Sequence, residues 1–373
     1  MKYQGKYMVT AAVFLMSAAL NLTNAQIKTL PDGFIEITQC PASSVKNQGK
    51  TGTCWSFSTS SFIESEVQKV IGQDIDLSEM FTVRNIYMEK AEKYVRYHGG
   101  SNFSQGSLGH DVFASFLKYG AMPEEAYPGK AKDSIHNHRV LEKELKSYLD
   151  QMIQAKQIDP HWKAGFAAII DKHLGEVPAV FKYKGQSYNA KSFAEMLELK
   201  PSNYIGITSF THQPLYQNVV VEVPDNFSDG KYFNTTLDEM METMNYALKN
   251  GYSIEWDGDV SEVGFQARSG YALMTTDTAA LMKLPILPPE QMVNAFLRQA
   301  AFDNYSTTDD HLMHVVGLVL SEDGRKFYIT KNSWSEKMGI EGYVLISEAY
   351  MRMKTVCIYV NRKGVPEELY QKM

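Results

Sequence analysis

The chain has 373 residues, a formal net charge of −6 and 44% hydrophobic residues. This length can bury a large core and leaves room for two domains or lobes. An acidic chain lacks the basic surface that nucleic acids require, so we expect no nucleic-acid partner.

The first 25 residues have the pattern of a secretory signal peptide. Lys2 and Lys6 precede an apolar run over about 8–20, and small and polar residues lead to Ala25. Cleavage after Ala25 would change the charge from −6 to −8, because two lysines and no acid are lost. The run is short for a bilayer span, and an uncleaved anchor is the alternative. We expect an exported protein, periplasmic or extracellular, without stable membrane insertion once residues 1–25 are removed.

Cys54 stands where turn-forming residues give way to a helical pattern. Gly49 and Gly52 precede it, and apolar residues then recur at spacings of three and four until Gly72 ends the helix. A thiol at a helix N-terminus feels the positive end of the dipole and unpaired N–H groups, which favour thiolate. Cys54 is therefore a candidate nucleophile, although a lone cysteine is usually a small buried hydrophobe.

Two further cysteines, Cys40 and Cys357, leave the disulfide question open. They could pair with each other and leave Cys54 free, or all three could be reduced.

The middle of the chain alternates between helical and strand patterns. The expected segments are helices at 79–97 and 111–119, a helical block over 133–173, strands at 204–208 and 218–223, and a helix at 238–248. The histidines of the helical block lack the spacing and carboxylate company of a metal site, so we interpret them as surface or packing residues (His136, His138, His161, His173). We expect no metal and no other cofactor.

A strand pattern over 311–320, a turn over 321–325 and a second strand over 326–331 predict a hairpin. Asn332 follows the second strand, so the hairpin brings it beside His311 at the start of the first. A Cys-His-Asn arrangement needs this geometry. His314 competes with His311 as the base, but the two differ by three positions and therefore point to opposite faces of the strand.

Residues 45–49 (Val-Lys-Asn-Gln-Gly) and 52–58 (Gly-Thr-Cys-Trp-Ser-Phe-Ser) resemble the nucleophile segment of papain-like cysteine peptidases. The resemblance implies that Gln48 donates its amide to the oxyanion, with the Cys54 N–H as second donor. Trp55 follows the nucleophile. Thr51 replaces the cysteine that many secreted members use in a disulfide.

The same resemblance implies roles for residues outside that segment. His311 is the base, because Val316-Gly317 follow it at the family's spacing of five and six residues. Asn332 orients the imidazole ring, and Trp334 shields their bond from water. Gly106 and Ser107 match the glycine pair that binds the extended substrate, with the second glycine replaced.

The nucleophile and the base are 257 positions apart, against about 130 to 150 in simple papain-type enzymes. This long separation resembles that of the bleomycin hydrolases and bacterial aminopeptidase C enzymes. Several stretches resemble the same enzymes: Lys118-Tyr119-Gly120-Ala121-Met122-Pro123, Leu174-Gly175-Glu176-Val177-Pro178, 248–251, 256–260 and 361–369. The resemblance implies an aminopeptidase acting on peptides, often hexameric, whose own C-terminal tail lies in the cleft. Here the sequence stops at Met373, which allows an alternative: an endopeptidase or oligopeptidase with an open cleft.

The resemblance implies an α+β, papain-like two-lobed cysteine peptidase fold. We expect a helical lobe over about 45–200, including a helical insertion over about 129–200. A strand-rich lobe would cover about 201–365 plus the N-terminal segment. Two other functions are weighed: a non-catalytic papain-like binding protein, against which the intact Gln48, Cys54, His311 and Asn332 argue, and acyl transfer of the transglutaminase kind, which prefers an aspartate as third member.

Overall fold

A computed structural model describes residues 27, 29–131, 134–156 and 158–373. The predicted signal peptide and its cleavage site therefore lie outside the described residues. Within the described part, no helix combines the length and the apolar character needed to cross a membrane.

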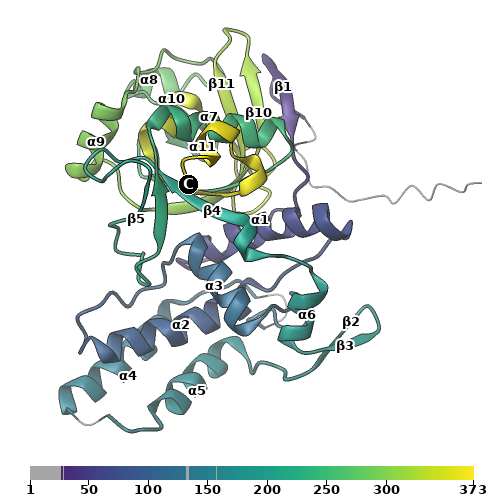
Figure 1. The fold of residues 1–373 in the computed structure, drawn as a ribbon, viewed down its shortest axis with the longest axis vertical. Coiled ribbons are helices and arrows are strands. Elements are labelled where there is room, and N and C mark those ends of the chain that lie inside the picture. Colours follow the sequence, from purple (N-terminus) through teal and green to yellow (C-terminus); the bar gives the residue numbers. More distant parts are fainter. Residues whose placement is uncertain (1–26, 28, 132–133, 157) are drawn as a thin grey trace, which may run out of the picture.

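Helices and strands separate into two lobes, with α1 between them (Figure 1). The helical lobe is built from six helices and a hairpin: α1 (Cys54–Ile71), α2 (Glu79–Arg96), α3 (Gly109–Tyr119), α4 (Arg139–Ala155), α5 (Trp162–Leu174), β2 (Phe181–Tyr183), β3 (Gln186–Tyr188) and α6 (Ala190–Met196). Gly72 caps α1 in the left-handed conformation that glycine adopts without strain.

The second lobe is a mixed sheet whose strand order is β5-β6-β4-β13-β7-β10-β11-β12-β9-β8, with β1 paired to β10. Its strands are β1 (Phe34–Gln39), β4 (Tyr204–Thr208), β5 (Gln217–Val220), β6 (Lys231–Asn234), β7 (Ile254–Gly258), β8 (Phe265–Gln266), β9 (Tyr271–Ala272), β10 (His311–Ser321), β11 (Lys326–Lys331), β12 (Tyr343–Ser347) and β13 (Thr355–Asn361). Its helices are α7 (Leu237–Lys249), α8 (Thr278–Leu281), α9 (Ala295–Asp303), α10 (Glu348–Lys354) and α11 (Glu367–Tyr370), with short 3-10 turns at Pro201–Asn203 and Arg362–Gly364.

Strand β10 is the centre of this lobe. Its first half pairs with β7, its second half pairs with β1, and β11 runs antiparallel along its other edge. The predicted hairpin is confirmed, with His314 opposite Lys331. His311 thus begins β10 and Asn332 directly follows β11, which places both at one end of the hairpin.

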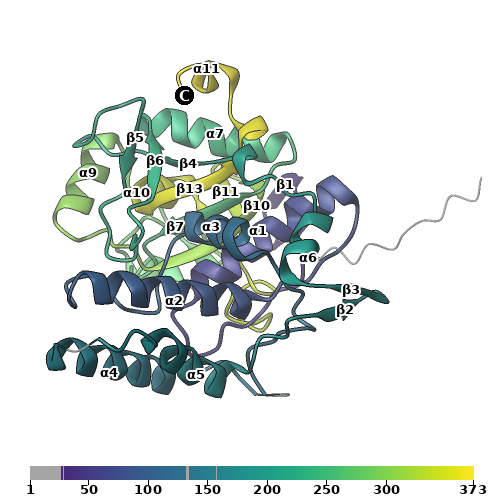
Figure 2. The ribbon, with the colours of Figure 1, turned by 60° about the horizontal axis from the view of Figure 1, so that its bottom comes forward.

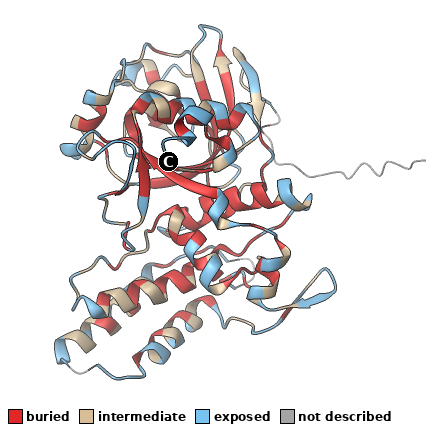
Figure 3. Cartoon of the chain, viewed as in Figure 1, coloured by how far each residue is buried: buried red, intermediate tan, exposed pale blue. Residues whose placement is uncertain are grey.

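Three buried clusters form the core, and one of them joins the two lobes. The largest fills the helical lobe and extends to Leu312 and Cys357, while the other two lie within the strand-rich lobe. Figure 3 shows α1 and the central strands buried along most of their length. Because α1 packs against both α3 and β10, it forms the boundary between the lobes, which we call the seam.

The predicted elements are largely present, with two differences. The block 133–173 is two helices, and between them Lys156 adopts a left-handed conformation. The strand expected at 218–223 ends at Val220, because Val223 N donates to Val221 O at 3.0 Å and the chain turns there. All three cysteines are free and buried, so Cys40 and Cys357 do not form a disulfide.

The last residues of the chain pack on the strand-rich lobe. Leu369 belongs to its core, Met373 lies against the same cluster, and Lys372 Nζ forms an ion pair with Glu239 of α7 at 2.6 Å. Figure 2 shows α11 and the C-terminus beside α7, while α1 and α2 lie across the sheet from them. In this structure residues 367–373 do not occupy the boundary between the lobes.

Candidate active site

Cys54 is the first residue of α1, as the turn residues before it predict. Its side chain is 8% exposed, so the sulfur faces the boundary between the lobes from a nearly closed position. A hydrogen bond between the Leu312 backbone and the thiol places the start of β10 beside Cys54, and His311 is the residue before Leu312.

The prediction that the helix N-terminus would favour thiolate is wrong for the protein without substrate. Burial raises the pKa of the Cys54 thiol to about 12 from an ordinary 9.0. The Leu312 hydrogen bond lowers this pKa, and the negative charges of Asp309, Asp257 and Asp225 raise it. Desolvation of an anion outweighs a helix dipole, whose effect is only about 0.3–1 kcal/mol. The resting thiol is therefore neutral.

His311, Asn332 and Trp334 form one packed unit. His311 Nε2 lies 2.9 Å from Asn332 Oδ1, and the Trp334 ring stacks on the imidazole with centroids 4.6 Å apart. With Nε2 donating to Asn332, the Nδ1 position of the ring is left to accept a proton. Burial lowers the pKa of His311 to about 4, whereas the Asn332 bond raises it, so the ring is neutral at neutral pH.

Gln48 is held by the segment that carries Asn332. The backbone N–H of Gln48 donates to Ser333 O at 2.9 Å, and its side-chain Oε1 accepts from Ser333 Oγ at 2.5 Å. The amide nitrogen donates to Thr51 O at 2.8 Å, which uses one of its two hydrogens. Ser333 therefore fixes which end of the amide is oxygen and which is donor. The sequence offered no signal for this role beyond its position next to Asn332.

Trp55, Gly106 and Ser107 lie around the start of α1 and α3. The fully buried Trp55 donates from Nε1 to Gln105 O at 2.9 Å, and Gly52 N donates to Gln105 Oε1 at 2.8 Å. Ser107 Oγ donates to Asp111 of α3 at 2.6 Å. The segment before α3, which includes Gly106, is therefore fastened directly to the turn that carries Cys54.

His314 lies in a different environment from His311. It is fully buried, its Nδ1 lies 2.8 Å from Ser61 Oγ, and its ring packs edge-on against Phe62. Ser61 also accepts from Lys331 Nζ at 2.7 Å. His311 and His314 thus contact different partners, Asn332 and Ser61, as strand alternation predicts.

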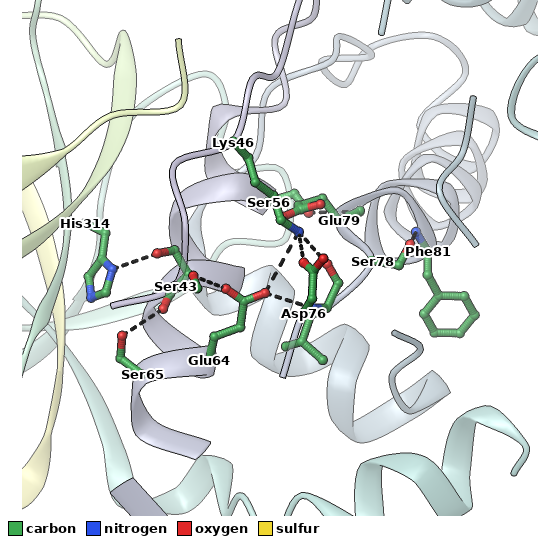
Figure 4. A network of polar contacts seen from close by, with 12 residues as sticks. Ser43, Lys46, Ser56, Glu64, Ser65, Asp76, Ser78, Glu79, Phe81 and His314 are labelled. Carbon is green, nitrogen blue, oxygen red and sulfur yellow. Dashed lines mark hydrogen bonds and ion pairs between the residues drawn. The ribbon is translucent and has the colours of Figure 1, made fainter. Parts of the chain in front are cut away.

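A buried polar network continues from Ser61 across the seam (Figure 4). Ser43 donates to Glu64, and Lys46 Nζ forms ion pairs with Glu79 at 2.6 Å and Asp76 at 2.5 Å. The network joins the N-terminal segment, α1, the start of α2 and the β10–β11 hairpin. It positions the two lobes that carry Cys54 and His311.

The described residues contain no group of three or more His, Cys, Asp or Glu side chains that could hold a metal ion. Of the four histidines of the helical block, His161 is exposed and the other three have structural partners. His138 Nδ1 lies 3.1 Å from Tyr87 Oη, His136 packs edge-on against Phe57, and His173 pairs with Glu144.

Known proteins share this fold. The PepW protein from Lactobacillus rhamnosis HN001, known from a crystal structure, superposes with a TM-score of 0.72 at 19% identity, covering 91% of this chain and 84% of that one. Aminopeptidase C of Listeria monocytogenes is 23% identical over 370 residues, covering 88% of this chain and 82% of the relative. Aminopeptidase C of Lactococcus lactis is 21% identical, with 94% and 87% covered.

The structural likeness confirms the two-lobed papain-like fold that the motifs around Cys54 and His311 predict. The sequence model of the Peptidase C1-like family matches residues 106–373, which is more than half of the chain and includes His311 and Asn332. This protein belongs to the Peptidase C1-like family, and it is a cysteine-type peptidase of papain-like fold.

Proposed function

We propose that the protein is an aminopeptidase that hydrolyses peptide bonds through a thioacyl-enzyme formed on Cys54. The observation that carries the proposal is the hydrogen bond between His311 and Asn332, at the end of β10 that contacts the Cys54 thiol. The similar aminopeptidase C enzymes support the same reaction class.

The reaction follows from the resting state of the two groups. A neutral His311 accepts the thiol proton as the sulfur attacks the peptide carbonyl, so an ion pair forms during the reaction. The carbonyl oxygen becomes an oxyanion, which the Gln48 amide and the Cys54 backbone N–H stabilise. The imidazolium then protonates the leaving amine, and water hydrolyses the thioester with His311 again as base. Asn332 keeps the ring in the required orientation throughout.

An alternative is an endopeptidase or oligopeptidase, favoured by the position of residues 367–373 on α7 rather than between the lobes. Peptide amides with free and with acetylated N-termini distinguish the two. Hydrolysis restricted to free amines supports the aminopeptidase, and equal rates on both support the open cleft.

A thiol-directed epoxide probe tests the nucleophile. The wild-type protein should be labelled once and lose activity, and Cys54→Ala should show neither labelling nor hydrolysis. Cys40→Ala is the matched control, because Cys40 is also buried but belongs to the core of the strand-rich lobe. Hydrolysis by Cys54→Ala would overturn the mechanism, and labelling without hydrolysis would favour a binding protein.

We further propose export by a signal peptide, and assembly into a homo-oligomer, up to the hexamer that the resemblance implies. The lysine-flanked apolar run before Ala25 supports the first. N-terminal sequencing of the protein from its native host should begin at Gln26, and intact Met1 would contradict cleavage. Sedimentation at several concentrations tests the second, and a monomer throughout would contradict it.

A further inference from the structure

One wall of the site is a carboxylate that lies against Gly106. A Cβ atom at position 106 would collide with the side chain of Asp225, so the carboxylate occupies the space that a side chain there would take. Asp225 Oδ1 accepts from Ser104 Oγ and from Asn102 Nδ2, each at 3.2 Å. Asp225 is only partly buried and is thus held in place while it remains accessible.

A second pair of carboxyl groups lies on the strand-rich side. Asp309 is two residues before His311, and Asp257 of β7 is opposite Leu312. Asp257 is fully buried. Its Oδ1 and Asp309 Oδ2 have no donor other than a proton that the two groups share. Burial raises the pKa of Asp309 to about 7 and that of Asp257 well above its ordinary value.

Negative charge on these carboxyl groups makes the Cys54 thiol harder to ionise. In their ionised forms Asp309, Asp257 and Asp225 each raise the pKa of Cys54, although the raised pKa of Asp257 favours its protonated form. Negative charge beside a thiol that must lose its proton slows attack unless a cation offsets it. A peptide that brings its own positive charge would supply that cation.

The buried cation nearby does not neutralise them directly. Lys90 Nζ donates to Gly106 O and to Ser104 Oγ, and it lies over the Phe227 ring. Among the described residues, neither Asp225 nor Asp309 forms an ion pair within 4 Å. Apart from the proton shared with Asp257, Asp309 Oδ2 has no hydrogen-bond donor, and burying a carboxyl group with so few donors costs free energy, which points to a binding role rather than a stabilising one.

We propose that Asp225 and Asp309 form a subsite for a positively charged group of the peptide substrate, beside Gly106 on the acyl side of the scissile bond. The inference rests on the proposed peptidase function and names its substrate class. A free α-ammonium group and a Lys or Arg side chain present the same chemistry to these carboxylates. Residues 367–373 lie on α7, away from the boundary between the lobes, so the negative charge that faces the substrate comes from Asp225 and Asp309.

Four amides with one fluorogenic leaving group separate the two sources: alanyl, acetyl-alanyl, acetyl-leucyl-alanyl and acetyl-lysyl-alanyl. Asp225→Asn and Asp309→Asn should each lower kcat/KM roughly tenfold or more on the cationic substrates, the scale of one charge-assisted hydrogen bond. They should leave the neutral substrates unchanged or faster. A loss limited to alanyl identifies the α-ammonium, and a loss limited to acetyl-lysyl-alanyl identifies the side chain.

Asp229→Asn is the matched control, because Asp229 lies on the same loop and pairs with Lys93 on the surface at 2.7 Å. It should behave as wild type on all four substrates. Equal losses on charged and neutral substrates in Asp225→Asn would overturn the proposal, as would a wild-type enzyme that makes no distinction between them.

A second measurement requires neither substrate hydrolysis nor a variant protein. Methanethiosulfonates carrying a trimethylammonium or a sulfonate group should label wild-type Cys54 at rates that differ roughly tenfold or more in favour of the cation. The ratio should shrink in 0.5 M salt, where the screening length is only a few ångströms. Equal rates at low salt would overturn the subsite. If no substrate is hydrolysed, the peptidase function fails, and the labelling ratio still decides on the subsite.

Discussion

Gln48 Oε1 and Ser333 Oγ are 2.5 Å apart, and this bond joins the predicted oxyanion donor to the residue after Asn332. It sets the direction of the Gln48 amide, whose nitrogen already donates to Thr51 O. Two residues that lie 285 positions apart are thereby joined, so the segment that carries the donor is tied to the segment that carries Asn332.

Gln48→Ala should lower kcat by roughly 10²–10³-fold, the loss seen when one oxyanion donor is removed. Ser333→Ala should lower kcat less, by a few fold, because the amide stays present but can rotate. Steady-state kinetics, with epoxide labelling of Cys54 as the control for an intact nucleophile, checks both. Equal activity in Gln48→Ala and wild type would exclude Gln48 from the oxyanion site.

His311→Ala should lower kcat at least 10³-fold, because the base and the later proton donor are lost. His314→Gln should retain kcat within a few fold and lose about 1–3 kcal/mol of stability, since its hydrogen bond to Ser61 is buried. Urea unfolding and turnover of each purified variant measure the two effects. A large loss of kcat in His314→Gln, with kcat retained in His311→Ala, would identify His314 as the base.

The local sequence was sufficient to predict that Cys54 begins a helix and that a hairpin brings Asn332 beside His311, because both depend on local geometry. Charge and burial at the seam could not be predicted in the same way. The sequence suggested a thiolate at the start of α1, and it did not indicate that Leu312 would bond to that thiol or that Asp257 and Asp225 would raise its pKa. Those effects involve residues far apart in the sequence and depend on packing, as does the bond between Gln48 and Ser333.

Lys46→Met should destabilise the protein by about 3–5 kcal/mol, because buried acids lose their cation. Burial alone would lower the pKa of Lys46, but Glu79, Glu64 and Asp76 raise it. Adding Glu79→Gln to Lys46→Met should recover part of that loss. Lys118→Met is the control, since its ion pair with Glu89 is solvent-exposed and such pairs contribute at most about 1 kcal/mol. Urea midpoints that fall equally for Lys46→Met and Lys118→Met would contradict the role of the seam network.

Low pH should destabilise the protein, because its buried neutral histidines take up protons when the chain unfolds. Burial lowers the pKa of both His136 and His138 to about 4 from an ordinary 6.5. Between pH 6.5 and 4 the unfolded chain binds more protons than the folded one, so stability is complete above 6.5 and falls as the pH approaches 4. Each histidine can contribute up to about 3 kcal/mol to this loss.

His138→Asn should therefore reduce the slope of unfolding free energy against pH in that window by up to about 1.4 kcal/mol per pH unit. Its stability at pH 7 should fall as well, because the bond to Tyr87 is lost. His161→Asn, at an exposed position, should keep the wild-type slope. Urea titrations at intervals from pH 7 to pH 4 give the slopes directly. A wild-type slope in His138→Asn would mean that other groups, among them His311 and His314, carry the acid sensitivity.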